Sequence, residues 1–202
     1  MIRAPRSKTS RAGFSLIEVL IAIGLMGLVL GNVYMVLGKG TKSYSAETGE
    51  SLADAHARRT IDRVAMAIVG ASRSTIYDAM EAPFSGSEIN FQTCLGVDAG
   101  AIVWSEPQRI ALTNDNGRQV TWFEAAGLAN ERRVAWSNWV TQLFKGEMAN
   151  GVDDNANGLK DEKGLSFDLD GDSVIIRLTI EKPGVDGTSI VKEHQARVTC
   201  RN

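Results

Sequence analysis

The sequence lacks the short signatures that mark common catalytic sites. Its 202 residues include only two histidines, His56 and His194, and no HExxH, GxSxG or cysteine-histidine pattern surrounds either one. The stretch from Gly31 to Lys39 resembles a phosphate-binding loop, but its spacing is too long and Gly40 stands where Ser or Thr is required. We therefore predict that the chain is not an enzyme.

Positive charge is scarce beyond the first thirteen residues. The chain has 22 Lys and Arg against 24 Asp and Glu, and four of the bases, Arg3, Arg6, Lys8 and Arg11, precede Gly13 in a stretch without acids. Setting those four aside leaves 18 basic against 24 acidic residues, a net charge of −6. Because such a body has no basic surplus to neutralise phosphates, we expect no nucleic-acid partner.

What the sequence does have is one long apolar run. Residues 14–37 contain a single charged residue, Glu18. As a helix this run would measure about 36 Å at 1.5 Å per residue, against roughly 30 Å of bilayer hydrocarbon. The basic leader places its N-terminal side in the cytoplasm and the remainder across the membrane. No A-x-A cleavage site follows Leu37, which disfavours an ordinary secretory signal peptide.

Glu18 is the residue that a plain single-pass anchor leaves unexplained. An ionisable side chain within a membrane span costs roughly 2.5 to 3.5 kcal/mol. The surrounding stretch GFSLIEVLIA, residues 13–22, resembles the prepilin signal of type IV pilins and type II secretion pseudopilins through Gly13, Phe14 and Glu18. Gly27 and Gly31 form a G-x-x-x-G pattern that permits close helix approach.

The resemblance implies a processing step and a set of partners. A prepilin peptidase would cut after Gly13 and methylate the new amino terminus at Phe14. That amine and the Glu18 carboxylate, about one helical turn apart, can pair within one chain or between staggered subunits, so two costly charges become one tolerated pair. The implied partners are prepilin peptidase, other pilin or pseudopilin subunits and an inner-membrane assembly platform. The implied location is the inner membrane, with a periplasmic C-terminal domain.

The rest of the chain predicts an α+β, pilin-like fold. Apolar residues at i, i+3, i+4 and i+7 spacings predict an amphipathic helix with Leu52, Ile61, Val64, Ala65 and Ile68 on its apolar face. Its AHARRTIDRVAMAI stretch is similar to the helix of J-class pseudopilins and W-class minor pilins. From Glu88 onward, short strand-like runs alternate with turn sequences such as DNG, LDGD and KPGVDGT. The runs are EINFQTCL (88–95), AIVWS (101–105), RIALT (109–113), RQVTWFEA (118–125), RRVAWS (132–137), LSFDLD (165–170), SVIIRLTIEK (173–182) and SIVKEHQARVTC (189–200). We expect a mostly antiparallel sheet packed on a long N-terminal helix. The expected segments are a cleaved leader (1–13), a membrane and polymerisation helix (14–37), its amphipathic continuation (38–72) and an exported β-rich domain (73–202).

The two cysteines, Cys94 and Cys200, both follow the apolar run and would lie in an oxidising compartment. A disulfide between them would close a loop of roughly 100 residues and contribute on the order of 4 to 5 kcal/mol in the chain-entropy model. We predict this bridge, with two buried thiols as the alternative.

A candidate calcium loop lies at residues 152–162, VDDNANGLKDE. Its candidate oxygen ligands are Asp153, Asn155, Asn157, Asp161, the Leu159 carbonyl and Glu162, with Gly158 at the turn. Calcium is favoured over zinc because every candidate ligand is a hard oxygen and no histidine or thiol is nearby. The loop departs from an EF-hand because Gly164 stands at the twelfth position in place of Glu. A polar surface turn is the alternative. The acidic run at Asp168, Asp170 and Asp172 predicts a hairpin turn at Asp170-Gly171.

These features predict a minor pilin or pseudopilin, a structural subunit of a type II secretion or type IV pilus-like filament near its tip or initiating complex. A DNA-uptake or adhesive pilus component is the rival within that machinery. Outside it, the alternative is a calcium-dependent, membrane-anchored binding module that does not polymerise.

Overall fold

The computed structural model describes residues 13, 15–114, 116–184 and 187–200. The chain divides into two compact units, residues 1–45 and 46–202. Helix α1, Leu16–Ile68, contributes to both. Within the first unit its side chains are exposed from Leu16 to Tyr44. Among the described residues, α1 is the one helix long and apolar enough to cross a membrane.

In the second unit, α1 buries one stripe of its surface. The buried residues recur every three or four positions: Ala53, Ala57, Thr60, Ile61, Val64 and Ile68. This confirms the predicted amphipathic helix, although Leu52, expected on the apolar face, is half exposed. The helix ends at Ile68, and the short 3-10 helix η1, Arg73–Thr75, follows.

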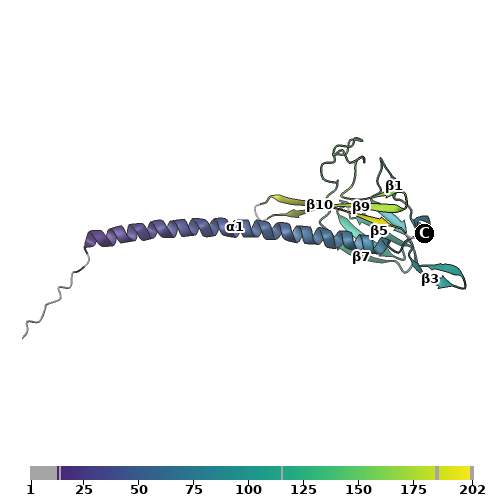
Figure 1. The fold of residues 1–202 in the computed structure, drawn as a ribbon, viewed down its shortest axis with the longest axis horizontal. Helices are drawn as coiled ribbons and strands as arrows, with labels where there is room; N and C mark the ends of the chain where they lie inside the picture. Colours follow the sequence, from purple (N-terminus) through teal and green to yellow (C-terminus); the bar gives the residue numbers. More distant parts are fainter. Residues whose placement is uncertain (1–12, 14, 115, 185–186, 201–202) are drawn as a thin grey trace, which may run out of the picture. The chain divides into compact units, whose positions relative to one another are not determined.

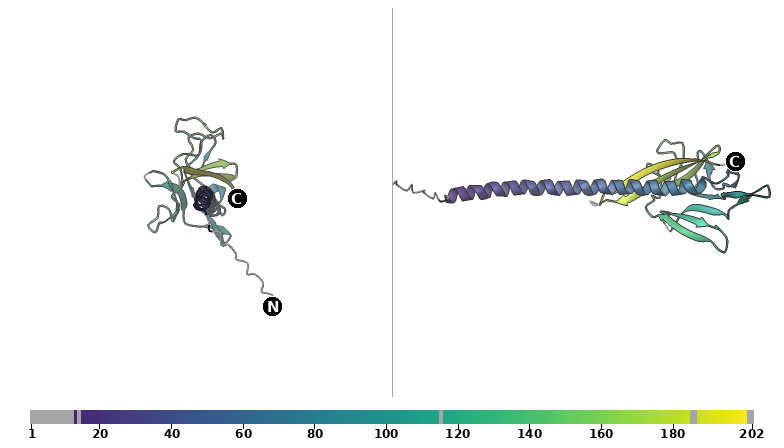
Figure 2. Two further views of the ribbon diagram at one scale, coloured as in Figure 1. Left: turned by 90° about the vertical axis from the view of Figure 1, so that its left-hand side faces the viewer. Right: turned by 60° about the horizontal axis from the view of Figure 1, so that its bottom comes forward.

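In the part of the chain that the structure describes, ten strands form three sheets. Sheet I has the order β1-β8-β9-β10, sheet II has the order β2-β5-β6-β7, and β3-β4 is a separate hairpin. The strand bounds are β1 (Met80–Glu81), β2 (Glu88–Phe91), β3 (Cys94–Asp98), β4 (Ala101–Trp104), β5 (Gln108–Thr113), β6 (Gln119–Glu124), β7 (Arg132–Ser137), β8 (Leu165–Asp170), β9 (Ser173–Pro183) and β10 (Ser189–Thr199). Strands of the two larger sheets lie on either side of the C-terminal part of α1 (Figures 1 and 2).

The pairing is antiparallel throughout except at β1, which pairs parallel to β8 with Met80 opposite Asp168. The predicted β8–β9 hairpin is present, but its turn residues are Gly171 and Asp172, one position later than the predicted Asp170-Gly171, and Gly171 has φ +60°. The expected α+β, pilin-like layout of a long helix on mostly antiparallel sheet is therefore confirmed.

Strands β8 and β9 are mostly buried on both faces, so other parts of the protein must pack against each face. One face is apolar and joins the core through Phe167, Ile176 and Leu178. The other face is polar and includes Asp168 and Arg177. Buried polar groups need partners, and the segment between β7 and β8 supplies one to this face, because the Lys145 backbone N–H donates to the Thr179 hydroxyl. The same segment pairs with the edge of β9, where the Thr141 N–H donates to the Thr179 carbonyl.

Candidate functional site

The start of α1 is closed by a reciprocal cap. The Ser15 backbone N–H donates to Glu18 Oε2 at 2.9 Å, and the Ile17 N–H donates to Ser15 Oγ at 3.3 Å. This is a capping box, in which Ser and Glu three residues apart satisfy donors at the helix N-terminus. The role of Ser15 was missed from the sequence, although S-x-x-E is its signature. Glu18 thus lies at the N-terminal end of the apolar helix.

The first unit presents an open apolar surface. Its large side chains from Leu16 to Leu37 are 45% to 82% exposed. An added Cβ at Gly24, Gly27 or Gly31 would meet no atom within 4 Å. This surface is therefore free for lipid or for another helix. Gly13 is exposed, whereas Phe14, the predicted first residue of the mature chain, lies outside the described residues.

The second candidate site is the 146–163 loop, which lies between β7 and β8. Four of the predicted ligand residues are linked there: Asp153, Asn155, Asn157 and Glu162. The backbone N–H groups of Asn157 and Gly158 donate to Asp153 Oδ1 and Oδ2 at 3.2 and 2.8 Å. The side-chain amides of Asn155 and Asn157 both donate to Glu162 Oε2. Gly158 has φ +90°, a left-handed conformation that suits the predicted sharp turn.

The other two predicted ligands are placed differently. Asp161 Oδ1 accepts the backbone N–H groups of Asn150 and Gly151 at 2.7 and 2.9 Å, so this carboxylate caps the preceding turn. The hydrogen bonds from Gly151 and Asn150 lower the pKa of Asp161. The Leu159 side chain is 2% exposed and anchors the loop in the protein, which leaves its backbone as the part relevant to a cation.

Glu162 belongs to a buried polar cluster on sheet I. It is fully buried, accepts a hydrogen bond from Ser166 Oγ at 3.3 Å and lies 4.0 Å from Arg177 Nε. Arg177 also pairs with Asp168, whose pKa is raised by burial in spite of that pairing. The cluster therefore holds two carboxylates around one guanidinium.

The donor set decides which cation could bind. Among the described residues, no group of three or more His, Cys, Asp or Glu side chains is arranged to hold a metal ion. A cation at this loop would have to draw on the amide oxygens of Asn155 and Asn157 and on backbone carbonyls as well as on carboxylates. Such an all-oxygen set suits Ca²⁺ and excludes a thiolate or imidazole zinc site.

Gly164 shows why the loop departs from the EF-hand pattern. A Cβ at this position would overlap the carbonyl oxygen of Thr141 and lie 2.7 Å from its Oγ1. The Gly164 carbonyl also accepts the backbone N–H of Thr179 at 2.7 Å. No side chain fits here, so the loop cannot carry a twelfth-position Glu.

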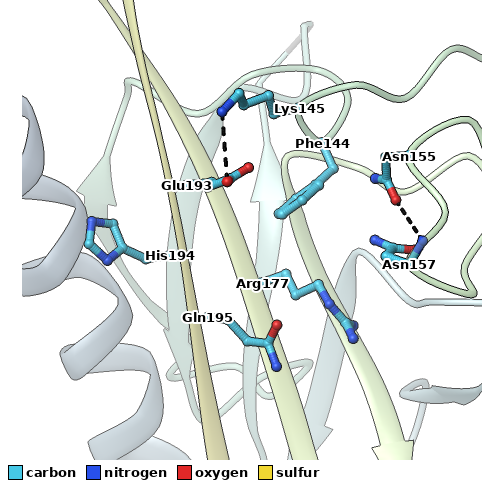
Figure 3. A pocket seen from close by; sticks show the side chains of 8 residues that line it. All are labelled: Phe144, Lys145, Asn155, Asn157, Arg177, Glu193, His194 and Gln195. Atoms are coloured by element: carbon cyan, nitrogen blue, oxygen red, sulfur yellow. Dashed lines mark hydrogen bonds and ion pairs between the residues drawn. The ribbon is translucent and has the colours of Figure 1, made fainter.

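A cleft of about 450 Å³ opens beside the loop (Figure 3). Residues of the loop side, β9 and β10 line it: Phe144, Lys145, Asn155, Asn157, Arg177, Glu193, His194 and Gln195. Lys145 pairs with Glu193 at 3.7 Å, and His194 points toward α1, where it contacts Asp54 at 2.9 Å (Figure 3). Charges of both signs line the cleft, and its cations are paired with acids.

The predicted disulfide is wrong. Cys94 and Cys200 are free thiols. Cys94 is exposed at the start of the β3–β4 hairpin, and Cys200 is buried in the core after β10. The chain-entropy model predicts stabilisation for any long closed loop, but a bridge also needs two thiols that face each other. Cys94 begins the β3–β4 hairpin, whereas Cys200 follows β10 of sheet I.

Comparison with known protein families gave a match to a short N-terminal motif. Residues 8–31 match the prokaryotic N-terminal methylation motif. A search of curated proteins and a search of solved structures found no match. The matched segment spans the end of the basic leader, the predicted cleavage position, the capped helix start and the first glycines of the apolar helix.

Proposed function

We propose that the chain is a minor subunit of a type IV pilus-like or type II secretion filament, which acts by assembly and recognition near the filament tip. The methylation motif supports a type IV pilin or pseudopilin, a structural subunit rather than an enzyme. The observation that carries the proposal is the placement of Glu18 at the start of an exposed apolar helix within that motif. Within that machinery we place the chain with J-class pseudopilins or W-class minor pilins, because its AHARRTIDRVAMAI helix stretch resembles theirs.

The assembly step depends on charge pairing in lipid. Cleavage after Gly13 would create an amine at Phe14, next to Ser15, whose N–H the Glu18 carboxylate already accepts. In a staggered array, Glu18 of one subunit can meet the amine of the next, which offsets the cost of both charges. The partners that follow are prepilin peptidase, other pilin-like subunits and an inner-membrane platform, with the C-terminal domain on the periplasmic side.

Calcium binding by the 146–163 loop is the second part of the proposal. Asp153, Asn155 and Asn157 alternate before Gly158, and the fold links all three with Glu162 in one small region. Ca²⁺ accepts such mixed carboxylate, amide and carbonyl oxygens. Asp161 accepts the Asn150 and Gly151 N–H groups through Oδ1, so Oδ2 is the atom that it would offer to the cation. A bound cation would fix the loop over the polar face of sheet I.

Two experiments test the assignment. Intact-mass analysis of the chain from cells with active prepilin peptidase should find an N-methylated chain that begins at Phe14, and a chain that retains residues 1–13 would contradict the processing step. Crosslinking in intact cells, followed by mass-spectrometric identification of neighbours, should recover pilin-like subunits. Recovery of secretion pseudopilins or of a major pilin would distinguish the two systems. Recovery of neither would favour the alternative, a calcium-dependent anchored binding module that does not polymerise.

A further inference from the structure

Glu147 lies outside the calcium pattern, six residues before Asp153. It nevertheless holds together two arms of the loop, one around Asn155 and the other around Asp161. Its side chain is buried, with 7% of the residue exposed. Glu147 Oε1 accepts the backbone N–H of Asn155 at 3.2 Å, and Oε2 accepts the N–H of Asp161 at 3.2 Å. The Glu147 carboxylate therefore joins the arm around Asn155 to the arm around Asp161.

The charge of Glu147 is not balanced by a side chain. Among the ion pairs of the described residues, none includes Glu147, and the nearby Glu162 shares Arg177 with Asp168. A buried carboxylate is costly unless hydrogen bonds or a cation offset its charge. Two backbone donors supply part of that compensation, and a divalent cation in the loop would supply the rest.

We infer that Glu147 is a positioning residue for the calcium loop, acting through the backbone of Asn155 and Asp161. This inference rests on the calcium binding proposed above. The carboxylate fixes the spacing of the two arms before the cation arrives, and its negative charge strengthens the field at the cation. Partners of this kind, which hold metal ligands in place, typically change metal affinity by about 10- to 100-fold when they are removed.

Calorimetric titration of Ca²⁺ into the detergent-solubilised full-length chain tests the inference. Glu147→Gln removes the charge and replaces one acceptor by a donor, so we expect its calcium affinity to fall by about 10-fold or more. Glu131→Gln is the matched control. Glu131 also ties a turn, accepting the Gly127 N–H at 2.8 Å, but it lies in the β6–β7 connection. This control should bind Ca²⁺ as the wild type does.

Melting temperature as a function of Ca²⁺ separates positioning from a purely structural role. We expect Glu147→Gln to regain the wild-type calcium-induced rise at about 10- to 100-fold higher Ca²⁺. An equal loss of melting temperature in EGTA and in saturating Ca²⁺ would overturn the inference, as would a Glu147→Gln titration that matches the wild type. If the wild type itself shows no calcium heat and no melting shift, the calcium site fails and the role of Glu147 fails with it. If the variant does not fold, Glu147→Asp, which is too short to reach both arms, replaces it with the same expectations.

Discussion

His56 Nε2 lies 2.9 Å from Ser137 Oγ and joins α1 to the end of β7. The same hydroxyl accepts the backbone N–H of Trp139 at 3.2 Å, and the His56 ring packs on the Trp139 ring with centroids 4.2 Å apart. His56 is therefore one of the residues that hold the helix against sheet II.

This contact predicts a loss of stability on acidification. Burial lowers the pKa of His56 below its ordinary value of 6.5, and the nearby Arg59 and Arg63 lower it further. The unfolded chain then binds a proton at higher pH than the folded chain does. The His56 contribution to the free energy of unfolding is present above pH 6.5 and is lost as the pH falls through 6.5 to the lower folded pKa.

Chemical denaturation at pH 7.5 and 5.5 measures this effect. Protonation of Glu and Asp side chains also changes the free energy of unfolding at lower pH. The decline in stability between the two pH values is therefore compared between variants and the wild type. His56→Gln keeps a hydrogen-bonding group near Ser137 but cannot titrate, and it should flatten the decline. His194→Gln leaves the His56 contacts intact and should keep it. An unchanged decline in His56→Gln would contradict the assignment.

Glu18 has two separable roles, and two substitutions distinguish them. Glu18→Gln keeps an oxygen that can accept the Ser15 N–H but removes the charge, whereas Glu18→Val removes both. We expect both variants to enter the membrane and to lose co-purification with partner subunits, because the pairing with a neighbouring amine needs the charge. Asn32→Val, a change elsewhere in the apolar helix that also raises hydropathy, should co-purify normally. Co-purification of Glu18→Gln with partner subunits at the wild-type level would show that the helix cap, without the charge, is enough for assembly.

Asp153 provides the direct test of the calcium loop. At 100 times the dissociation constant, a bound ligand stabilises a protein by about 2.7 kcal/mol, so calcium should raise the melting temperature of the wild type. Asp153→Ala removes the acceptor of the Asn157 and Gly158 N–H groups and should abolish the rise. Asp98→Ala, an exposed acid at the end of β3, should preserve it. A full calcium response in Asp153→Ala would reduce the loop to a polar turn.

Gly164→Ala should destabilise the domain whether or not calcium is present. The added methyl group would overlap the Thr141 backbone, and forced overpacking of this kind costs about 1 to 3 kcal/mol. Gly70→Ala is the control, because its Cβ would lie 3.5 Å from Thr93, an ordinary contact. Urea unfolding measures both variants. Equal stability of Gly164→Ala and the wild type would show that Thr141 can move aside.

Sequence patterns anticipated most of the fold because its strands carry strong local signals. Strands β5 to β10 follow predicted runs closely, since each is bounded by turn residues and rich in β-formers. Strand β1 was missed because two residues, Met80 and Glu81, are too short for any periodic signal. The predicted 88–95 run divides into β2 and β3, because Cys94 leaves sheet II to begin a separate hairpin.

The candidate loop was only partly predictable. Ligand-like spacing predicted Asp153, Asn155, Asn157 and Asp161 as candidate ligands, but spacing alone could not show that Asp161 caps the turn at Asn150 and Gly151. Glu147 carries no local signature, because its role comes from long-range hydrogen bonds that form only when the loop closes. The need for glycine at position 164 likewise could not be predicted, because it comes from Thr141, which lies next to Gly164 only in the folded chain.

The free state of the two cysteines makes the native chain selectively reactive. Cys94 is exposed, whereas Cys200 is buried and burial raises the pKa of its thiol. Because the thiolate is the reacting species, a maleimide dye should modify Cys94 and spare Cys200 in the folded protein. The β3–β4 hairpin can therefore carry a single fluorescent label without any substitution, and its emission would report on whatever approaches the exposed Leu95 and Val97 beside it.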